Sequence, residues 1–246
     1  MDGELVRDGD AYVLRFQRDL PHPVDRVWQA ITDPSHLAAW FPHPVELELR
    51  VGGKAVFIND PSFDVDEELL ASSGEVIELD PNRRFAFTWG NDLLRFELSP
   101  TATGCRLVFT HHLPHRACVN RTVSGWSVCL DSFEASLDGV AANSPGWRHY
   151  YDRYVEVLGD DGVVSHEDGR TVLRFERLMP ASKERVQSAL RDEPFDSPEG
   201  QVKWQLIPIG DTSLALLTHT VDGDWDATAA TAEWDRVLRG LAERLA

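Results

Sequence analysis

The segment Gly125–Leu137, GWSVCLDSFEASL, limits the possible folds most, because its large apolar residues recur at the spacing of one helix face. They stand four, three and four positions apart, at Trp126, Leu130, Phe133 and Leu137. The same spacing returns 108 positions later, at Trp234, Leu238, Leu241 and Leu245. Two amphipathic helices of one design are therefore predicted, each of which closes one part of the chain.

A second stretch repeats at a different distance. Thr171–Asp192 aligns with Tyr12–Asp33 at a constant shift of 159, and ten of the 22 positions are identical. From Val202 to Leu245 the shift is 108, which pairs Phe96 with Trp204, His111 with His219 and Trp126 with Trp234. The difference between the shifts, 159 − 108 = 51, predicts a deletion in a second copy of one unit. That copy should keep a strand, a helix, two strands and the closing helix.

The first half alternates short apolar runs with turn residues. Tyr12–Arg18 suits a strand, and 23–32 suits a helix that stops at Asp33-Pro34 before a short second helix over 35–40. Six further strands are predicted between turn residues, over Val45–Arg50, Lys54–Ile58, Ser73–Glu78, Arg84–Trp89, Leu93–Ser99 and Cys105–Leu113. An antiparallel sheet of about seven strands follows, while the acidic stretch 60–70 fits either a loop or a short helix.

Taken in order, these segments resemble the SRPBCC, or START-like, superfamily, and within it the proteins similar to the C-terminal domain of the activator of Hsp90 ATPase. The matching pieces together cover about 120 residues: LPHPVDRVWQAITDPSHLAAWF at 20–41, VGGKAVF at 51–57, GEVIELDPNRRFAFTW at 74–89, GCRLVFTHHL at 104–113 and GWSVCLDSFEASL at 125–137. The resemblance implies an α+β helix-grip fold, in which a curved antiparallel sheet wraps around a long C-terminal helix with a cavity between them.

Three regions are predicted along the chain. Residues 1–140 form a complete helix-grip domain, 141–162 a connecting helix and linker, and 163–246 a truncated second copy. The aromatic stripe of the connecting helix, with Trp147, Tyr150, Tyr151 and Tyr154, suits packing of the shortened copy on the complete domain. A homodimer in which the sheet edge of the shortened copy pairs with its twin is the alternative.

Composition excludes several classes of partner. The chain has 24 basic and 41 acidic residues, and the net charge of −17 repels nucleic acids and anionic membranes. The N-terminal sequence lacks the basic and apolar regions of a signal peptide, and no apolar run reaches the length of a membrane span. Three cysteines without CxxC spacing fit reduced thiols, so a cytoplasmic protein is expected.

Few residues suggest chemistry. The chain has no glycine-rich phosphate loop, no GxSxG and no HExxH motif. The cluster of His111, His112 and His115 with Cys118 contains zinc-ligating atom types, but adjacent strand residues point to opposite faces, so His111 and His112 do not readily share an ion. Neither a metal nor a cofactor is predicted. Because no acid–base pair stands out, the enzyme class stays uncertain and a non-catalytic role is favoured.

If a cavity is present, aromatic residues of the sheet and of the closing helix should line it. The predicted ligand-binding residues are Trp40, Phe57, Phe87, Trp89, Phe96, Phe109, His111, Trp126, Leu130 and Phe133. The alternation of strand residues places His111 on the same side as Phe109, which makes it the expected polar group inside.

Three functions remain, in this order. The first is non-catalytic binding of a small apolar molecule in the helix-grip cavity. The second is an interaction with a chaperone, as the resemblance to the Hsp90 activator implies. The third is a polyketide cyclase-like activity, which the resemblance implies through other relatives.

Overall fold

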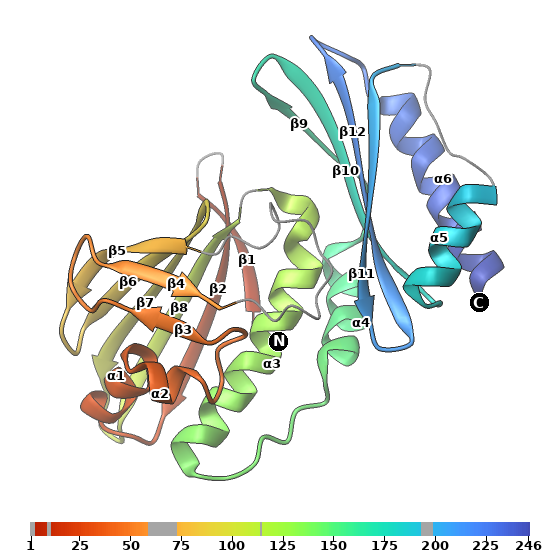
Figure 1. Ribbon diagram of the computed structural model, residues 1–246. Helices are drawn as coiled ribbons and strands as arrows, with labels where there is room; N and C mark the ends of the chain where they lie inside the picture. Colours follow the sequence, from red (N-terminus) through yellow and green to blue (C-terminus); the bar gives the residue numbers. More distant parts are fainter. Residues whose placement is uncertain (1–2, 9–10, 59–72, 114, 193–198) are drawn as a thin grey trace. The chain divides into compact units, whose positions relative to one another are not determined.

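The computed structural model describes residues 3–8, 11–58, 73–113, 115–192 and 199–246 (Figure 1). The chain divides into two compact units, of which the first ends at Leu158 and the second runs from Gly159 to Ala246. Each unit has its own apolar core. The stretch 60–70, predicted as a loop or a short helix, lies outside the described residues.

The first unit is built on an antiparallel sheet of eight strands in the order β1-β2-β8-β7-β6-β5-β4-β3. The strands are β1 (Gly3–Asp8), β2 (Ala11–Leu20), β3 (Val45–Leu47), β4 (Lys54–Phe57), β5 (Ser73–Asp80), β6 (Arg84–Trp89), β7 (Asp92–Pro100) and β8 (Cys105–Leu113). The helices are α1 (Val24–Thr32), α2 (Pro34–Leu37), α3 (Val119–Asp138) and α4 (Trp147–Leu158), with a 3₁₀ turn at Arg116–Cys118. The predicted α+β helix-grip fold is confirmed.

The expected strand count was one too low, because β1 was not predicted. This edge strand buries Gly3 alone, and its remaining residues are exposed or half-buried. An edge strand of this kind lacks the alternation of apolar and polar residues on which strand prediction depends.

The long helix α3 packs against the sheet through the predicted stripe. Trp126, Leu130, Phe133 and Leu137 are all at most 4% exposed, and burial of each such side chain contributes about 1.5–3 kcal/mol. The helix ends at Gly139, which has a left-handed backbone (φ 70°) and donates its N–H to the carbonyls of Ala135 and Ser136. It begins six residues before the predicted segment.

Helix α4 packs within the first unit. The hydroxyl of Tyr154 accepts a hydrogen bond from the backbone N–H of Gly3 in β1 (3.0 Å) and lies 3.3 Å from Oγ of Ser127 in α3. Tyr150 donates to Asp131 of α3 at 2.8 Å. The aromatic stripe of α4 therefore packs on α3, and Tyr154 links α3 to the first strand.

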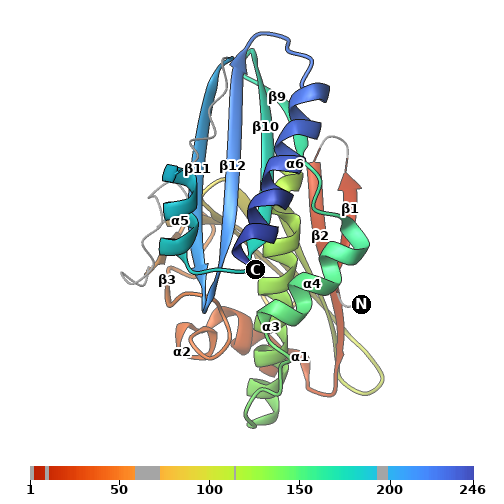
Figure 2. The same ribbon diagram turned by 90° about the vertical axis from the view of Figure 1, so that its right-hand side faces the viewer.

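The second unit has a four-stranded antiparallel sheet in the order β11-β12-β10-β9. Its elements are β9 (Val163–Glu167), β10 (Arg170–Met179), α5 (Lys183–Asp192), β11 (Gln201–Ile209), β12 (Thr212–Asp222) and α6 (Thr228–Leu245). Helix α6 lies along one face of this sheet (Figure 2). The prediction of three strands omitted β9, a short edge strand joined to β10 by a tight turn with positive φ at Asp168 and Gly169.

Three strands pair in the same register in both units. In the first, Leu14 of β2 and Leu94 of β7 stand opposite His111 of β8. In the second, Leu173 of β10 and Val202 of β11 stand opposite His219 of β12. The shifts of 159 and 108 that relate the sequences thus also relate the strand pairs.

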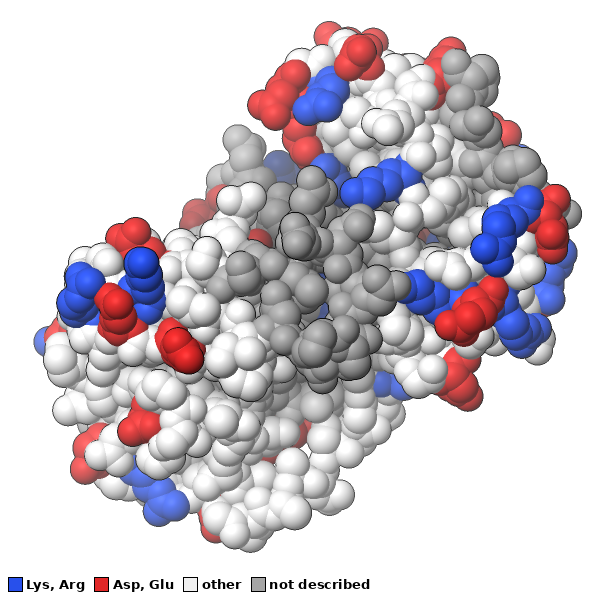
Figure 3. Space-filling view, in the orientation of Figure 1, with Lys and Arg blue, Asp and Glu red and all other residues white. Residues whose placement is uncertain are grey.

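Charged side chains of both signs lie on the surface. Figure 3 shows basic side chains next to acidic ones on the face in view. Within the described residues, no helix is both long enough and apolar enough to cross a membrane.

Candidate functional site

Aromatic rings fill the interior of the first unit between the sheet and α3. The structure brings the predicted aromatic site residues together. Near α3, the ring centroids lie 4.9 Å apart for Trp40 and Phe133 and 4.6 Å apart for Phe109 and Trp126, and within the sheet those of Phe96 and Phe109 lie 4.7 Å apart. The centroid of Phe57 lies 4.8 Å from that of Trp89 and 6.0 Å from that of Phe87. Leu130 lies fully buried in the same core. Phe41, which was not predicted, links these rings and lies 5.5 Å from Trp126.

One end of this interior is less enclosed. Trp89 is only partly buried and stacks edge-on with His43 at 5.2 Å, whereas Trp40, Phe96 and Phe109 are at most 4% exposed. The rings therefore form a continuous apolar surface that approaches solvent near the turn between β6 and β7.

His111 lies in this interior between two hydrogen-bonding partners. Nε1 of Trp126 donates to Nδ1 of His111 at 2.7 Å, and Nε2 of His111 lies 2.9 Å from Oδ2 of Asp92. An indole N–H only donates, so Nδ1 is the unprotonated nitrogen and Nε2 carries the proton. His111 is therefore a neutral imidazole that donates to the Asp92 carboxylate. The side chain of His111 is 4% exposed and that of Asp92 is 28% exposed. The hydrogen-bonded series Asp92–His111–Trp126 therefore runs from the surface into the core.

Asp92 is the residue that sequence reasoning missed. It begins β7 two residues before Leu94, which stands opposite His111 in the sheet. Residues two apart on a strand share a face, so the predicted pairing of these strands contained the signal that Asp92 and His111 meet.

The histidine cluster does not gather into a metal site in the described part of the chain. No group of three or more His, Cys, Asp or Glu side chains there is arranged to hold a metal. His111 is buried on the inner face, while His112 is half-buried on the other face, where burial and the nearby charge of Arg95 lower its pKa. Cys118 instead places its thiol 3.0 Å from the carbonyl of His115.

The second unit repeats the histidine–tryptophan bond. Nε1 of Trp234 donates to Nδ1 of His219 at 3.1 Å, and the two rings meet at 82°, the same angle as His111 and Trp126. Nε2 of His219 lies 2.6 Å from the backbone carbonyl of Glu199, so His219 is also the neutral form protonated at Nε2. A carbonyl here takes the place of the Asp92 carboxylate.

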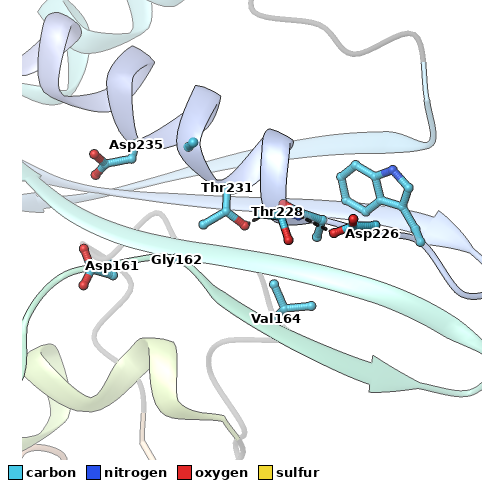
Figure 4. Close-up of a pocket in the computed structure, with 10 residues that line it drawn as sticks. Asp161, Gly162, Val164, Asp226, Thr228, Thr231 and Asp235 are labelled. Carbon is cyan, nitrogen blue, oxygen red and sulfur yellow. Dashed lines mark hydrogen bonds between the residues drawn. The ribbon is translucent and has the colours of Figure 1, made fainter.

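A groove of about 610 Å³ opens in the second unit between β9 and the N-terminal half of α6 (Figure 4). It is lined by Asp161, Gly162, Val164, Trp225, Asp226, Ala227, Thr228, Thr231, Ala232 and Asp235. Three of these residues are acidic and none is basic. Asp226 accepts a hydrogen bond from the backbone N–H of Thr228 at 3.0 Å, and the hydroxyl and N–H of Thr228 hold the pKa of Asp226 below its ordinary value.

A charge network borders this groove. Arg177 of β10 is 5% exposed and donates to Asp160 and to Asp235 at 2.8 Å each. Arg239 of α6 binds the other oxygen of Asp235 at 2.9 Å. Burial raises the pKa of Asp235, but the hydrogen bonds from Arg239 and Arg177 outweigh that effect and hold it below the usual range. Asp235 and Asp160 are thereby paired with two arginines, whereas Asp161 and Asp226 join no salt bridge of the described residues, although the charge of Arg239 also acts on Asp161.

Comparison with known proteins identifies a family that the first unit resembles in sequence and solved structures that are similar to the chain. Residues 21–138 match the family model described as Activator of Hsp90 ATPase homolog 1-like protein. A conserved protein of unknown function from Enterococcus faecalis is 21% identical, with a TM-score of 0.54 over 63% of this chain and 90% of that chain. CalU16 from Micromonospora echinospora is 21% identical, with a TM-score of 0.47 over 63% of this chain and 91% of its own. The first of these likenesses supports the fold alone. No curated protein matches the chain.

Proposed function

Because residues 21–138 are a domain of the AHSA1-like family with a helix-grip fold, we propose that the chain binds a small apolar molecule between the sheet and α3 of its first unit and does not convert it chemically. One observation carries this proposal. The interior is a continuous aromatic surface, and the hydrogen-bonded residues Asp92, His111 and Trp126 lie at its less enclosed end. Ligand sites of proteins typically combine apolar walls with a few polar groups that orient the ligand.

The hydrogen bonds of His111 favour binding over catalysis. A general base needs a free lone pair within reach of the proton that it removes. The lone pair of Nδ1 already accepts the N–H of Trp126, and the proton of Nε2 already points to Asp92. The half-exposed Asp92 carboxylate has acceptor capacity beyond this bond, so it would accept a hydrogen bond from a hydroxyl or N–H group of the ligand.

The proposal is tested with N-phenyl-1-naphthylamine, an uncharged fluorescent probe with one N–H group, and with two matched variants. Leu130→Trp adds bulk to the interior of the first unit, and Leu238→Trp adds the same bulk at the position 108 residues later. Both leucines are fully buried, so both changes strain a core to a similar degree. We expect wild type and Leu238→Trp to bind the probe and Leu130→Trp to lose binding.

Melting temperatures separate a ligand site from a filled core. Overpacking a filled core costs about 1–3 kcal/mol, whereas a space that accepts a ligand absorbs part of the added volume. Absence of probe binding by the wild type, together with a lower melting temperature of Leu130→Trp, contradicts the proposal. Equal loss of binding in both variants contradicts the assignment to the first unit.

A further inference from the structure

The groove of the second unit lies between its first strand and its closing helix, and the matching space in the first unit is occupied by side chains. The shift of 159 relates Gly162 and Val164 to Gly3 and Leu5, and the shift of 108 relates the lining residues of α6 to residues of α3. The backbone supports this match: Gly3 and Gly162 both pack directly on a phenylalanine ring of the next strand, Phe16 and Phe175, where a Cβ atom would clash. The gap between the first strand and the closing helix is therefore the same feature in both units.

In the first unit, this gap is closed by Val123 of α3, which packs directly on Gly3, and by Tyr154 of α4. The counterparts of Ala227, Thr228, Thr231, Ala232 and Asp235 are Val119, Asn120, Val123, Ser124 and Ser127, all at most 5% exposed. Tyr154 of α4 contacts both sides of the gap, since its hydroxyl accepts from Gly3 and lies 3.3 Å from Ser127. A helix with an aromatic face thus has the shape that this gap accepts.

In the second unit, the described residues include no helix over this gap. Its two helices are α5 and α6, and α5 lies near the other end of α6, where Arg185 donates to the carbonyl of Leu245. Several of the matching positions are open: Ala232, Thr228 and Val164 are exposed and border the groove of about 610 Å³, whereas Ala227 is buried. The lining also carries an added negative charge, because Asp226 stands where the first unit has Cys118.

We propose that this groove docks an amphipathic helix of a partner protein, in the place that α4 takes in the first unit. The partner helix presents an aromatic residue to the floor at Gly162 and Val164, and lysine or arginine residues to Asp161 and Asp226. Charge complementarity selects a basic helix, because among the described residues no salt bridge joins either carboxylate to an arginine, and only the more distant charge of Arg239 acts on Asp161. Helix-in-groove binding of this kind uses side chains on one helix face as anchors.

Peptides based on α4 test the proposal on the full-length chain by fluorescence anisotropy. The probe has the sequence of residues 147–158 with Asp152→Lys and Glu156→Lys, two positions that are exposed in α4, so its aromatic face is kept. A staple on the solvent face keeps so short a peptide helical. The comparison peptide instead carries Arg148→Glu and Arg153→Glu. We expect the basic peptide to bind at least about tenfold more tightly than the acidic one, and more weakly at high salt.

Two matched pairs of variants locate the binding. Ala232→Trp fills the groove and should weaken binding by at least about tenfold, whereas Glu243→Trp, on an exposed position of the same helix outside the groove, should change it less than about twofold. Asp161→Asn and Asp226→Asn should each weaken binding, whereas Asp211→Asn in the exposed turn after β11 should not.

Absence of binding by the basic peptide, or equal affinity of wild type and Ala232→Trp, overturns the proposal. So does self-association of the wild type that Ala232→Trp abolishes, because the occupant is then a second copy of this chain.

Discussion

The two units share a central structure and differ in what surrounds it. Three strands in one register, a closing helix and a buried histidine–tryptophan bond occur in both. The first unit adds β3–β6, and these strands with α2 and the residues that follow it supply Trp40, Phe41, Phe57, Phe87 and Trp89. These five rings of the aromatic interior therefore come from segments without a counterpart among the described elements of the second unit, whereas Phe96, Phe109, Trp126 and Phe133 come from elements that both units share.

The outer faces of the two sheets also differ. In the first unit the face away from α3 carries Arg15, Gln17 and Arg106, of which Arg106 pairs with Asp19 on the same face. In the second unit, Leu214 stands at the position of Arg106 and is fully buried, whereas Val172 matches Val13, an apolar residue that is buried in the first unit as well. Fewer strands and a more apolar outer face make the second unit the less self-sufficient of the two.

The largest expected effect comes from separating the units. A fragment of residues 1–158 should fold and melt cooperatively, whereas residues 159–246 alone should be unfolded or aggregate, because a four-stranded sheet with two helices buries too small an apolar core to offset the chain entropy lost on folding. The second fragment starts at Gly159 so that the pair of Asp160 and Arg177 is kept. Circular dichroism and size-exclusion chromatography measure both. A cooperative transition of the second fragment would show that its four strands suffice.

The next effect concerns two arginines related by the shift of 159. The side chain of Arg177 is 6% exposed and lies between Asp160 and Asp235. Arg177→Met should therefore lower the free energy of unfolding of the second unit by about 3 kcal/mol. This is the lower end for breaking a buried ion pair, because Arg239 still pairs with Asp235. Arg18 pairs with Glu134, whose side chain is 44% exposed, so Arg18→Met should cost the first unit only about 1 kcal/mol. Hydrogen exchange of amides in β2 and β10 reports each unit separately. Equal losses would contradict the difference in burial.

The shared histidine–tryptophan bond should contribute equally in both units. Trp126→Phe and Trp234→Phe keep a ring but remove the N–H that His111 and His219 accept, which leaves a buried acceptor unsatisfied and costs about 1–3 kcal/mol. Nitrogen-15 spectra of the imidazoles should show protonation at Nε2 in both wild-type histidines. A much larger loss in one unit would mean that the second partner, Asp92 or the Glu199 carbonyl, dominates there.

A smaller effect appears in acid. Burial raises the pKa of Asp235, but hydrogen bonds from Arg239 and Arg177 hold it below the ordinary value of 3.8, so folding favours the ionised carboxylate. Its contribution to stability is complete above the unfolded pKa and is lost as pH falls through the lower folded pKa. The second unit should therefore lose stability as pH falls below about 4, and Asp235→Asn should flatten that slope. Asp211→Asn is the control and should leave the slope unchanged.

The sequence predicted the fold best where side-chain spacing reports burial. The stripes of α3 and α6 and the alternation of β8 follow directly from residues such as Trp126, Leu130 and Phe109, which are buried as expected. Strands β1 and β9 were missed because edge strands bury few side chains. The glycines that begin these stretches, Gly3 and Gly162, repeat at the shift of 159 and contained a signal.

The site was predictable in part. Alternation placed His111 inside, but the identity of its partners depends on which residues meet across strands, and Asp92 was found only from the pairing of β7 with β8. The groove of the second unit left no sequence pattern of its own. In the first unit, α4 packs beside the first strand and the closing helix, and it has no counterpart among the described helices of the second unit. This difference becomes visible only when the packing of the two units is compared.

The smallest expected effect, on thiol reactivity, tests whether the units open independently. All three cysteines lie in the first unit, and burial raises the pKa of Cys105 and raises that of Cys129 to about 12. The thiolate is the reactive form, so labelling by a disulfide reagent at pH 8 should be slow and should follow opening of the first unit. Arg18→Met should accelerate labelling about fivefold, the factor that corresponds to 1 kcal/mol, while Arg177→Met should leave the rate unchanged. If Arg177→Met accelerates labelling as much as Arg18→Met, the two units unfold together, and differences in their stability have to be explained by coupling between them.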